Sequence, residues 1–238
     1  MGADTAQLTF SFPTRSALGR EDFIVTPSNA MAADTVLTPA SWPSGRLAII
    51  GPAGAGKTHL AHVAMADTPA TLTTVDELTP ESAPALAVPG LAVVEDVDRL
   101  ADLAKGRRER AEDGLFHLFN LAASGRTRLL LTGRGAPVRW RIATPDLASR
   151  LQSVTIAEIA PPDDALLAAL LLKIGRDRGL DIVPNAAAWV VHRVERSFAG
   201  IADAAGKLDA EASLRKRRRV TQALAAQALR GPSDKNAP

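Results

Sequence analysis

Residues 46–58, Arg46-Leu-Ala-Ile-Ile-Gly51-Pro-Ala-Gly-Ala-Gly-Lys57-Thr58, decide the fold of this chain. From Gly51 onward they match the pattern G-x-x-x-x-G-K-[ST] at every required position. The apolar residues before Gly51 predict a short buried strand, and residues 59–66 predict a helix. A strand that leads into a helix through a glycine-rich loop directs backbone N–H groups and the positive helix end at one point. The stretch therefore predicts a phosphate-binding loop.

The loop also predicts its ligand, which we expect to be ADP or ATP with Mg²⁺. The Lys57 ammonium can reach the β- and γ-phosphates, and the Thr58 hydroxyl can ligate Mg²⁺. The residues expected to contact the nucleotide here are Gly51, Pro52, Gly54, Ala55, Gly56, Lys57, Thr58 and His59.

Composition narrows the class of protein. The 238 residues include no cysteine, which excludes disulfides, thiolate metal sites and a thiol nucleophile. We see no secretory signal pattern and no apolar run long enough to span a membrane, and we expect a cytoplasmic protein that binds no membrane. Net charge is only +2, but basic residues cluster at Arg107-Arg108 and at Arg215–Arg219. Such runs are either solvated loops or contacts for nucleic acid.

Short apolar runs alternate with helical segments between about residues 21 and 160, which predicts a parallel sheet covered on both faces. The predicted strands are Arg46–Ile50, Thr71–Val75, Leu91–Val94, Arg128–Thr132 and Val154–Ile156. The predicted helices between them are His59–Ala66, Glu112–Ser124 and Pro145–Gln152. Residues 79–90 are rich in proline and alanine and give no clear assignment.

The pattern changes at Pro161-Pro162, after which every segment is predicted to be helical. The expected helices are Asp163–Arg178, Pro184–Val194, Ser197–Leu214 and Thr221–Leu229. The expected organisation is thus an N-terminal arm (residues 1–20), an α/β nucleotide-binding core (21–160), a small helical lid (161–230) and a disordered tail (231–238).

Two acids follow the third predicted strand, in Leu91-Ala-Val-Val-Glu95-Asp96. Ligands of open α/β sheets bind at the carboxyl ends of strands, so these carboxylates are predicted to lie beside the phosphates. Glu95 would hold Mg²⁺ and Asp96 would orient an attacking water; the alternative is an Asp that only caps a helix. Asp is the usual residue at the position of Glu95. The glutamate side chain is one methylene longer, which displaces the carboxylate. We therefore expect weak hydrolysis by this chain alone.

Two further positions are candidates with two readings each. Thr132 ends the fourth strand, where its hydroxyl either lies beside the γ-phosphate or caps the strand end. Arg150, in Pro145-Asp-Leu-Ala-Ser-Arg150-Leu151, is either a surface arginine or one that projects toward the active site of a neighbouring subunit and stabilises transition-state charge there.

These motifs and their order resemble the AAA+ ATPases, and within them the branch of the bacterial replication initiator DnaA. The resemblance covers about residues 20–230. It implies a P-loop core with a five-stranded parallel sheet and a small C-terminal lid. It also implies that Phe23 and Val25, in a segment continuing to Ser28-Asn29, frame the adenine. A lid arginine that contacts phosphate in the family would fall near Ala199, with Arg196 one turn earlier.

The N-terminal arm carries Gln7-Leu8-Thr-Phe10-Ser-Phe12, which resembles the bacterial sliding-clamp motif Q-L-x-L-x-F with Phe10 in place of the second leucine. We expect the initiator's C-terminal helix-turn-helix domain to be absent, because little sequence follows the lid. A DnaA-type core with a clamp motif is similar to the Hda family, which acts in regulatory inactivation of DnaA.

That resemblance implies two partners. The polymerase III sliding clamp, loaded on DNA, would bind Gln7, Leu8, Phe10 and Phe12, and DnaA would receive Arg150 as an arginine finger at its own ATP. DNA would be contacted through this complex. Two other functions stay open: a self-sufficient AAA+ ATPase or helicase loader, and a DNA-binding accessory protein acting through Arg215–Arg219. For the arm, the alternative is an edge strand on its own domain.

Overall fold

The computed structural model describes residues 23–230. The predicted clamp motif with Gln7, Leu8, Phe10 and Phe12, and the predicted disordered tail, lie outside these residues.

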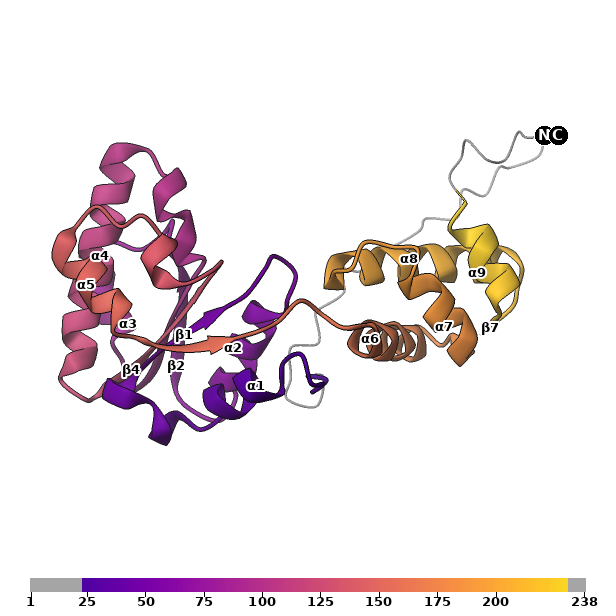
Figure 1. Cartoon of the computed structure of the whole chain (residues 1–238), viewed down its shortest axis with the longest axis horizontal. Helices are drawn as coiled ribbons and strands as arrows, with labels where there is room; N and C mark the ends of the chain where they lie inside the picture. The colour runs from indigo at the N-terminus through magenta and orange to yellow at the C-terminus, as the bar shows by residue number, and fades with distance from the viewer. Residues whose placement is uncertain (1–22, 231–238) are drawn as a thin grey trace, which may run out of the picture.

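A parallel five-stranded sheet forms the centre of the core, with strand order β2-β3-β4-β1-β5 (Figure 1). The sheet confirms the predicted fold class. The middle strands carry the most apolar runs because both of their faces are covered. The strands are β1 (Arg46–Ile50), β2 (Ala70–Thr74), β3 (Gly90–Glu95), β4 (Thr127–Gly133) and β5 (Thr155–Glu158).

Helices cover the two faces of this sheet. Helices α1 (Ala30–Val36) and α2 (Lys57–Met65) share one apolar cluster with Leu47, Ile49 and Leu130. Helices α3 (Ala83–Leu86), α4 (Lys105–Ala123) and α5 (Pro145–Gln152) pack on the other face. Four short 3₁₀ helices complete the core: η2 (Pro39–Ser41), η3 (Pro43–Gly45), η4 (Val97–Asp102) and η5 (Pro137–Arg139).

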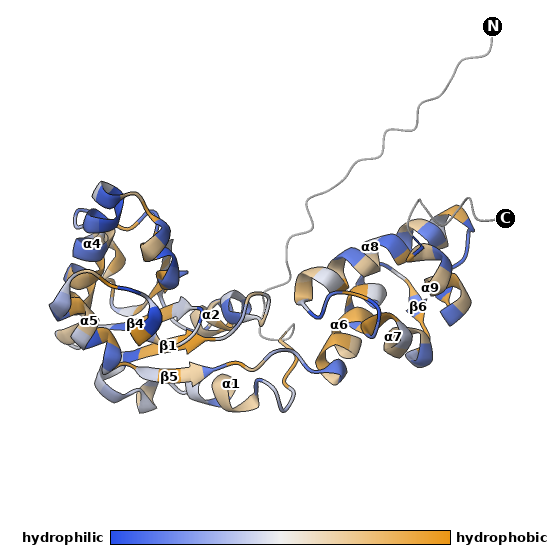
Figure 2. Cartoon of the chain, turned by 45° about the horizontal axis from the view of Figure 1, so that its top comes forward, coloured by the Kyte–Doolittle hydropathy of each residue, from blue (hydrophilic) through white to orange (hydrophobic). Residues whose placement is uncertain are grey.

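Helix α4 begins at Lys105, seven residues before the predicted start at Glu112. Its first two turns are mostly charged and exposed, so they carry no apolar period that would reveal a helix. Figure 2 shows this hydrophilic surface on α4, in contrast to the hydrophobic strand β1.

The lid consists of α6 (Asp164–Asp177), α7 (Pro184–Val191), α8 (Phe198–Leu214) and α9 (Gln222–Ala228) around an apolar core of its own. The side chains of Asp163, Ser197 and Thr221 cap α6, α8 and α9. The prediction that the lid is entirely helical is wrong, because β6 (Asp181–Ile182) pairs in parallel with β7 (Arg219–Val220). Two-residue strands are too short to show a period of two in the sequence.

The lid stands to one side of the core in both views, joined to it by the segment after β5 (Figures 1 and 2). The N-terminal end of α8 lies against the phosphate-binding loop. Among residues 23–230, no helix has the length and apolar character that crossing a bilayer requires.

Candidate functional site

The predicted phosphate-binding loop connects β1 to α2. Gly54 and Gly56 have φ values of +68° and +93°, a left-handed conformation that favours glycine. The Lys57 side chain is only 8% exposed, and its Nζ donates to the carbonyl oxygens of Gly51 and Pro52, both at 2.9 Å. The ammonium group is therefore held by the backbone at the start of its own loop.

The pKa of Lys57 is shifted by the charged groups that surround its ammonium group. Burial lowers the pKa of Lys57, and the negative charges of Asp98 and Asp96 oppose that shift. Arg134 lowers the same pKa, whereas Glu95 raises it. The loop thus faces a cluster of three carboxylates and one guanidinium.

Glu95 is the last residue of β3 and is 8% exposed. Its Oε1 atom is buried and has no hydrogen-bond partner among residues 23–230. A buried carboxylate oxygen without a partner is unfavourable unless a cation or donor binds it. Glu95 therefore fits the role of a metal ligand beside the loop.

Thr132 is completely buried at the end of β4, next to β3 in the sheet. Its Oγ1 atom accepts a hydrogen bond of 3.1 Å from the backbone N–H of Asp96. Asp96 has a φ of +57°, which is uncommon for a residue other than glycine. The Thr132 hydroxyl therefore helps to hold Asp96 in this left-handed conformation.

Asp98 and Arg134 belong to the same cluster but were not predicted. The Arg134 Nε atom lies 3.9 Å from Oδ2 of Asp98, and Oδ1 of Asp98 is buried with no hydrogen-bond partner in the described part of the chain. Asp98 lies in η4 and Arg134 follows β4. The available signal was a third acid in Glu95-Asp-Val-Asp98.

The segment before α1 lies against the first turn of α2. The ring of Phe23 meets that of His59 edge to face, with centroids 5.2 Å apart. Asn29 folds the segment, because its side chain accepts from the Thr26 N–H and donates to the Ile24 carbonyl, both at 2.9 Å. Val25 is 57% exposed. The structure therefore brings Phe23 next to the loop and leaves the Val25 side chain largely accessible.

The lid approaches the loop through the start of α8. A Cβ built at Gly54 would lie 3.0 Å from Cβ of Ser197, and one at Gly56 would lie 3.5 Å from the ring of Phe198. Substitution of either glycine would thus strain the loop, and substitution of Gly54 would also crowd the lid.

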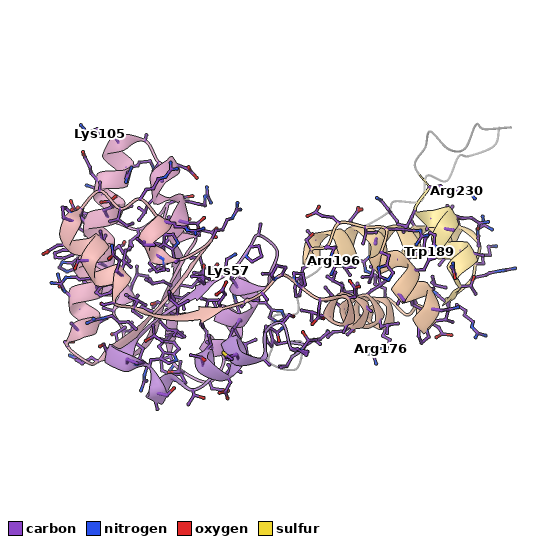
Figure 3. The ribbon with its side chains drawn as sticks, viewed as in Figure 1. Lys57, Lys105, Arg176, Trp189, Arg196 and Arg230 are labelled. Carbon is purple, nitrogen blue, oxygen red and sulfur yellow. The ribbon has the colours of Figure 1, made fainter. Side chains whose placement is uncertain are left out.

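The predicted lid-arginine position is occupied by Ala199, which carries no charge. Arg196 lies at the end of the lid that faces the core (Figure 3), but its guanidinium pairs with Asp164 and contacts the Pro162 carbonyl. This arginine is therefore engaged within the lid.

Arg150 lies near the end of α5, far from the loop. Its guanidinium carbon is 5.0 Å from the ring centroid of Phe116. Burial lowers the pKa of Arg46, and the positive charge of Arg150 lowers it further. Arg150 therefore lies near Arg46, which is the first residue of β1. The loop follows the last residue of β1, so the length of a five-residue strand, about 15 Å, separates Arg46 from the loop. Arg150 thus lies near the amino-terminal ends of the strands, whereas the chain's own phosphate-binding loop lies at their carboxyl ends.

Comparison with known proteins supports this architecture. No protein-family model matches the chain. The chromosomal replication initiator protein DnaA of Thermomicrobium roseum is 29% identical over 237 residues, covering 88% of this chain and 49% of that protein. The chain therefore spans about half the length of this curated relative.

Domain III of DnaA from Thermotoga maritima superposes with a TM-score of 0.73 and 22% identity, covering 95% of this chain and 100% of that one. The chain has a DnaA-like AAA+ fold. A second AAA+ structure, AMPPCP-bound DnaA from Aquifex aeolicus, has a TM-score of 0.65 at 18% identity and covers 84% of this chain and 69% of its own. Structural similarity at these identities shows the AAA+ fold alone.

Proposed function

We propose that this chain binds ADP or ATP with Mg²⁺ at the loop Gly51–Thr58. The observation that carries the proposal is the glycine loop with a buried lysine and, beside it, the unpartnered Oε1 of Glu95. The AMPPCP complex of the similar Aquifex aeolicus DnaA supports it. Thr58 and Glu95 would hold Mg²⁺, which when bound neutralises phosphate charge. Phe23, His59 and Val25 would border the base.

The chain's own residues give this site a binding role more than a catalytic one. Lys57 would exchange two carbonyl contacts for charge-assisted bonds to phosphate, which are the stronger kind. Asp96 is held by Thr132 and would orient a water. The start of α8, next to the loop, carries Ala199 where an arginine would stabilise phosphate charge. We therefore propose slow intrinsic hydrolysis.

Calorimetry with ADP and ATP tests the binding proposal. Lys57→Ala should weaken affinity by about 10- to 150-fold, because a hydrogen bond to a charged group contributes about 1.5–3 kcal/mol. Lys105→Ala, which removes an exposed lysine at the far end of the core (Figure 3), is the matched control. Equal affinities for all three proteins would refute the site.

We further propose that the chain regulates initiation of DNA replication in the cytoplasm, by stimulating ATP hydrolysis in DnaA through Arg150. Similarity to DnaA supports a place in initiation. The position of Arg150 supports action in trans, because this side chain lies at the amino-terminal ends of the strands, away from its own loop. The clamp motif, Gln7 to Phe12, supports recruitment to a DNA-loaded sliding clamp.

ATP turnover by DnaA with the loaded clamp tests the role of Arg150. Arg150→Ala should abolish stimulation while nucleotide affinity and melting temperature stay unchanged, since a finger supplied in trans is worth about 10³–10⁵-fold in known GTPases. Arg139→Ala removes an exposed arginine just before α5 and is the control. Full stimulation by the Arg150 variant would refute the assignment.

A clamp pull-down tests the arm. Replacing Gln7, Leu8 and Phe10 with alanine should eliminate clamp binding and leave the melting temperature unchanged. A lower melting temperature with clamp binding preserved would favour the alternative, an arm that pairs with its own domain. A self-sufficient ATPase or helicase loader would instead turn over ATP without DnaA and assemble into rings.

A further inference from the structure

The lid carries a cluster of positive charge that the proposed function leaves unused. We call Arg215-Lys216-Arg217-Arg218-Arg219, between α8 and β7, the basic turn. All five side chains are exposed. Figure 1 shows this turn at the end of the lid away from the sheet. Because α8 has 17 residues and begins at the phosphate-binding loop, the basic turn lies about 25 Å from that loop.

The backbone of the basic turn is fixed by hydrogen bonds. The N–H groups of Lys216 and Arg217 donate to the carbonyls of Ser213 and Ala212, at 3.0 and 2.9 Å. The carbonyl of Arg218 accepts from the Asp181 N–H at 2.8 Å, which ties the turn to β6. The cationic side chains therefore extend from an ordered scaffold, which lowers the entropy that binding would cost.

Acidic neighbours compensate the basic turn only in part. Arg215 pairs with Glu211 at 2.6 Å, but Arg218 and Arg219 lie 3.6 and 3.9 Å from their acidic partners, Asp209 and Asp181. Lys216 and Arg217 have no ion pair among residues 23–230.

The basic cluster of the core, around Arg107-Arg108, provides a contrast. Arg107 has no ion pair among residues 23–230, but the arginines beside it are paired: Arg108 with Glu112 at 2.9 Å and Arg110 with Glu81 at 2.8 Å. The whole lid, residues 161–230, holds 12 basic and eight acidic residues, whereas residues 23–160 hold 13 and 14. The positive charge of the chain is therefore concentrated in the lid.

We propose that the basic turn binds the phosphate backbone of duplex DNA directly. Clustered guanidinium groups suit phosphate oxygens, and their contacts carry no sequence information. Residues 199–238 contain no aromatic residue, so the basic turn and the segments directly before and after it carry no ring on which single-stranded bases could stack. Helix α8 buries Ile201, Leu208 and Ala212 in the lid, and Leu214 is its only large apolar side chain that is exposed, so within the described residues α8 presents no continuous apolar face to a bilayer.

This inference goes beyond the proposed function, in which DNA is reached only through the clamp. A surface that contacts the duplex itself would add a second attachment and orient the lid on DNA. The clamp and DnaA can therefore be left out of its test.

The experiment measures fluorescence anisotropy of the full chain with a labelled 20-base-pair duplex at about 50–200 mM salt. The variant Lys216→Gln/Arg217→Gln removes the two cations without acidic partners. The control Lys105→Gln/Arg107→Gln removes the same charge from an exposed part of α4. Affinity should fall about 10-fold or more in the lid variant only, and the slope of log K against log salt should become shallower by about 2.

Three results would overturn the proposal. Unchanged affinity in the lid variant would show that the basic turn does not touch DNA. Equal losses of affinity in both variants would show that DNA binding depends on the net charge of the chain and not on the basic turn. Stronger binding to anionic vesicles or to single strands than to the duplex would identify a different ligand. Melting temperatures of both variants should match the wild type, because all four replaced side chains are exposed.

Discussion

Glu112→Ala is predicted to cause a large loss of stability. Glu112 lies on α4 with 2% of its surface exposed. Its carboxylate accepts from Nε of Arg108 at 2.9 Å, and from the backbone N–H and the hydroxyl of Thr144, both at 2.8 Å. The N–H of Ala143 donates to both carboxylate oxygens. One side chain thus ties α4 to the start of α5, the helix that carries Arg150.

The expected loss follows from these contacts. Removing the carboxylate leaves two backbone N–H groups, one hydroxyl and a partly buried guanidinium without their partner. Removing one member of a buried ion pair typically costs about 3–5 kcal/mol. For a chain of this length, each kcal/mol shifts the melting temperature by about 2–4 °C, so we expect a decrease of about 6–20 °C.

Chemical and thermal denaturation followed by circular dichroism measure this loss. Glu109→Ala, an exposed glutamate on the same helix, is the control and should change stability by less than about 0.5 kcal/mol. Glu112→Gln keeps the shape but loses the charge, and should fall between the two. If Glu112→Ala is as stable as the Glu109 control, the carboxylate does not anchor α5 and the reasoning is refuted.

Three other outcomes are expected. Burial raises the pKa of Glu112, but hydrogen bonds from Ala143, Arg108 and Thr144 outweigh it and the pKa is lowered. The stabilisation by Glu112 is therefore complete above about pH 4.3, the pKa of glutamate in the unfolded chain, and is lost as the pH falls below that value. Between pH 7 and pH 3 the free energy of unfolding should therefore decrease less in Glu112→Gln than in the wild type, as measured by denaturation. Gly114→Ala should destabilise by about 1–3 kcal/mol despite better helix propensity, because the new Cβ would lie 2.6 Å from the backbone carbon of Thr79; an unchanged unfolding free energy would contradict this. Thr132→Val should cost about 1–3 kcal/mol by leaving the Asp96 N–H unpaired, and a neutral result in urea titration would show that water replaces the hydroxyl.

The sequence by itself determined the features that short windows encode. β1 and α5 have the predicted bounds, because the four apolar residues after Arg46 and a Pro-initiated amphipathic helix are local signals. The phosphate-binding loop was predictable because its glycines and lysine are required at fixed spacing. The clamp motif in residues 7–12 stays a prediction from sequence.

Only the tertiary structure decided which distant residues meet. Thr132 bonds to Asp96 because β4 lies beside β3, an order that no local pattern encodes. The sequence predicted Glu112 only as the start of a helix, and the fold brings residues 143 and 144 against its carboxylate. The engagement of Arg196 by Asp164, and the pairing of β6 with β7, likewise depend on how the lid helices pack. Local propensity sets the elements, whereas burial and hydrogen-bond satisfaction between elements far apart in sequence select the partners of their polar groups.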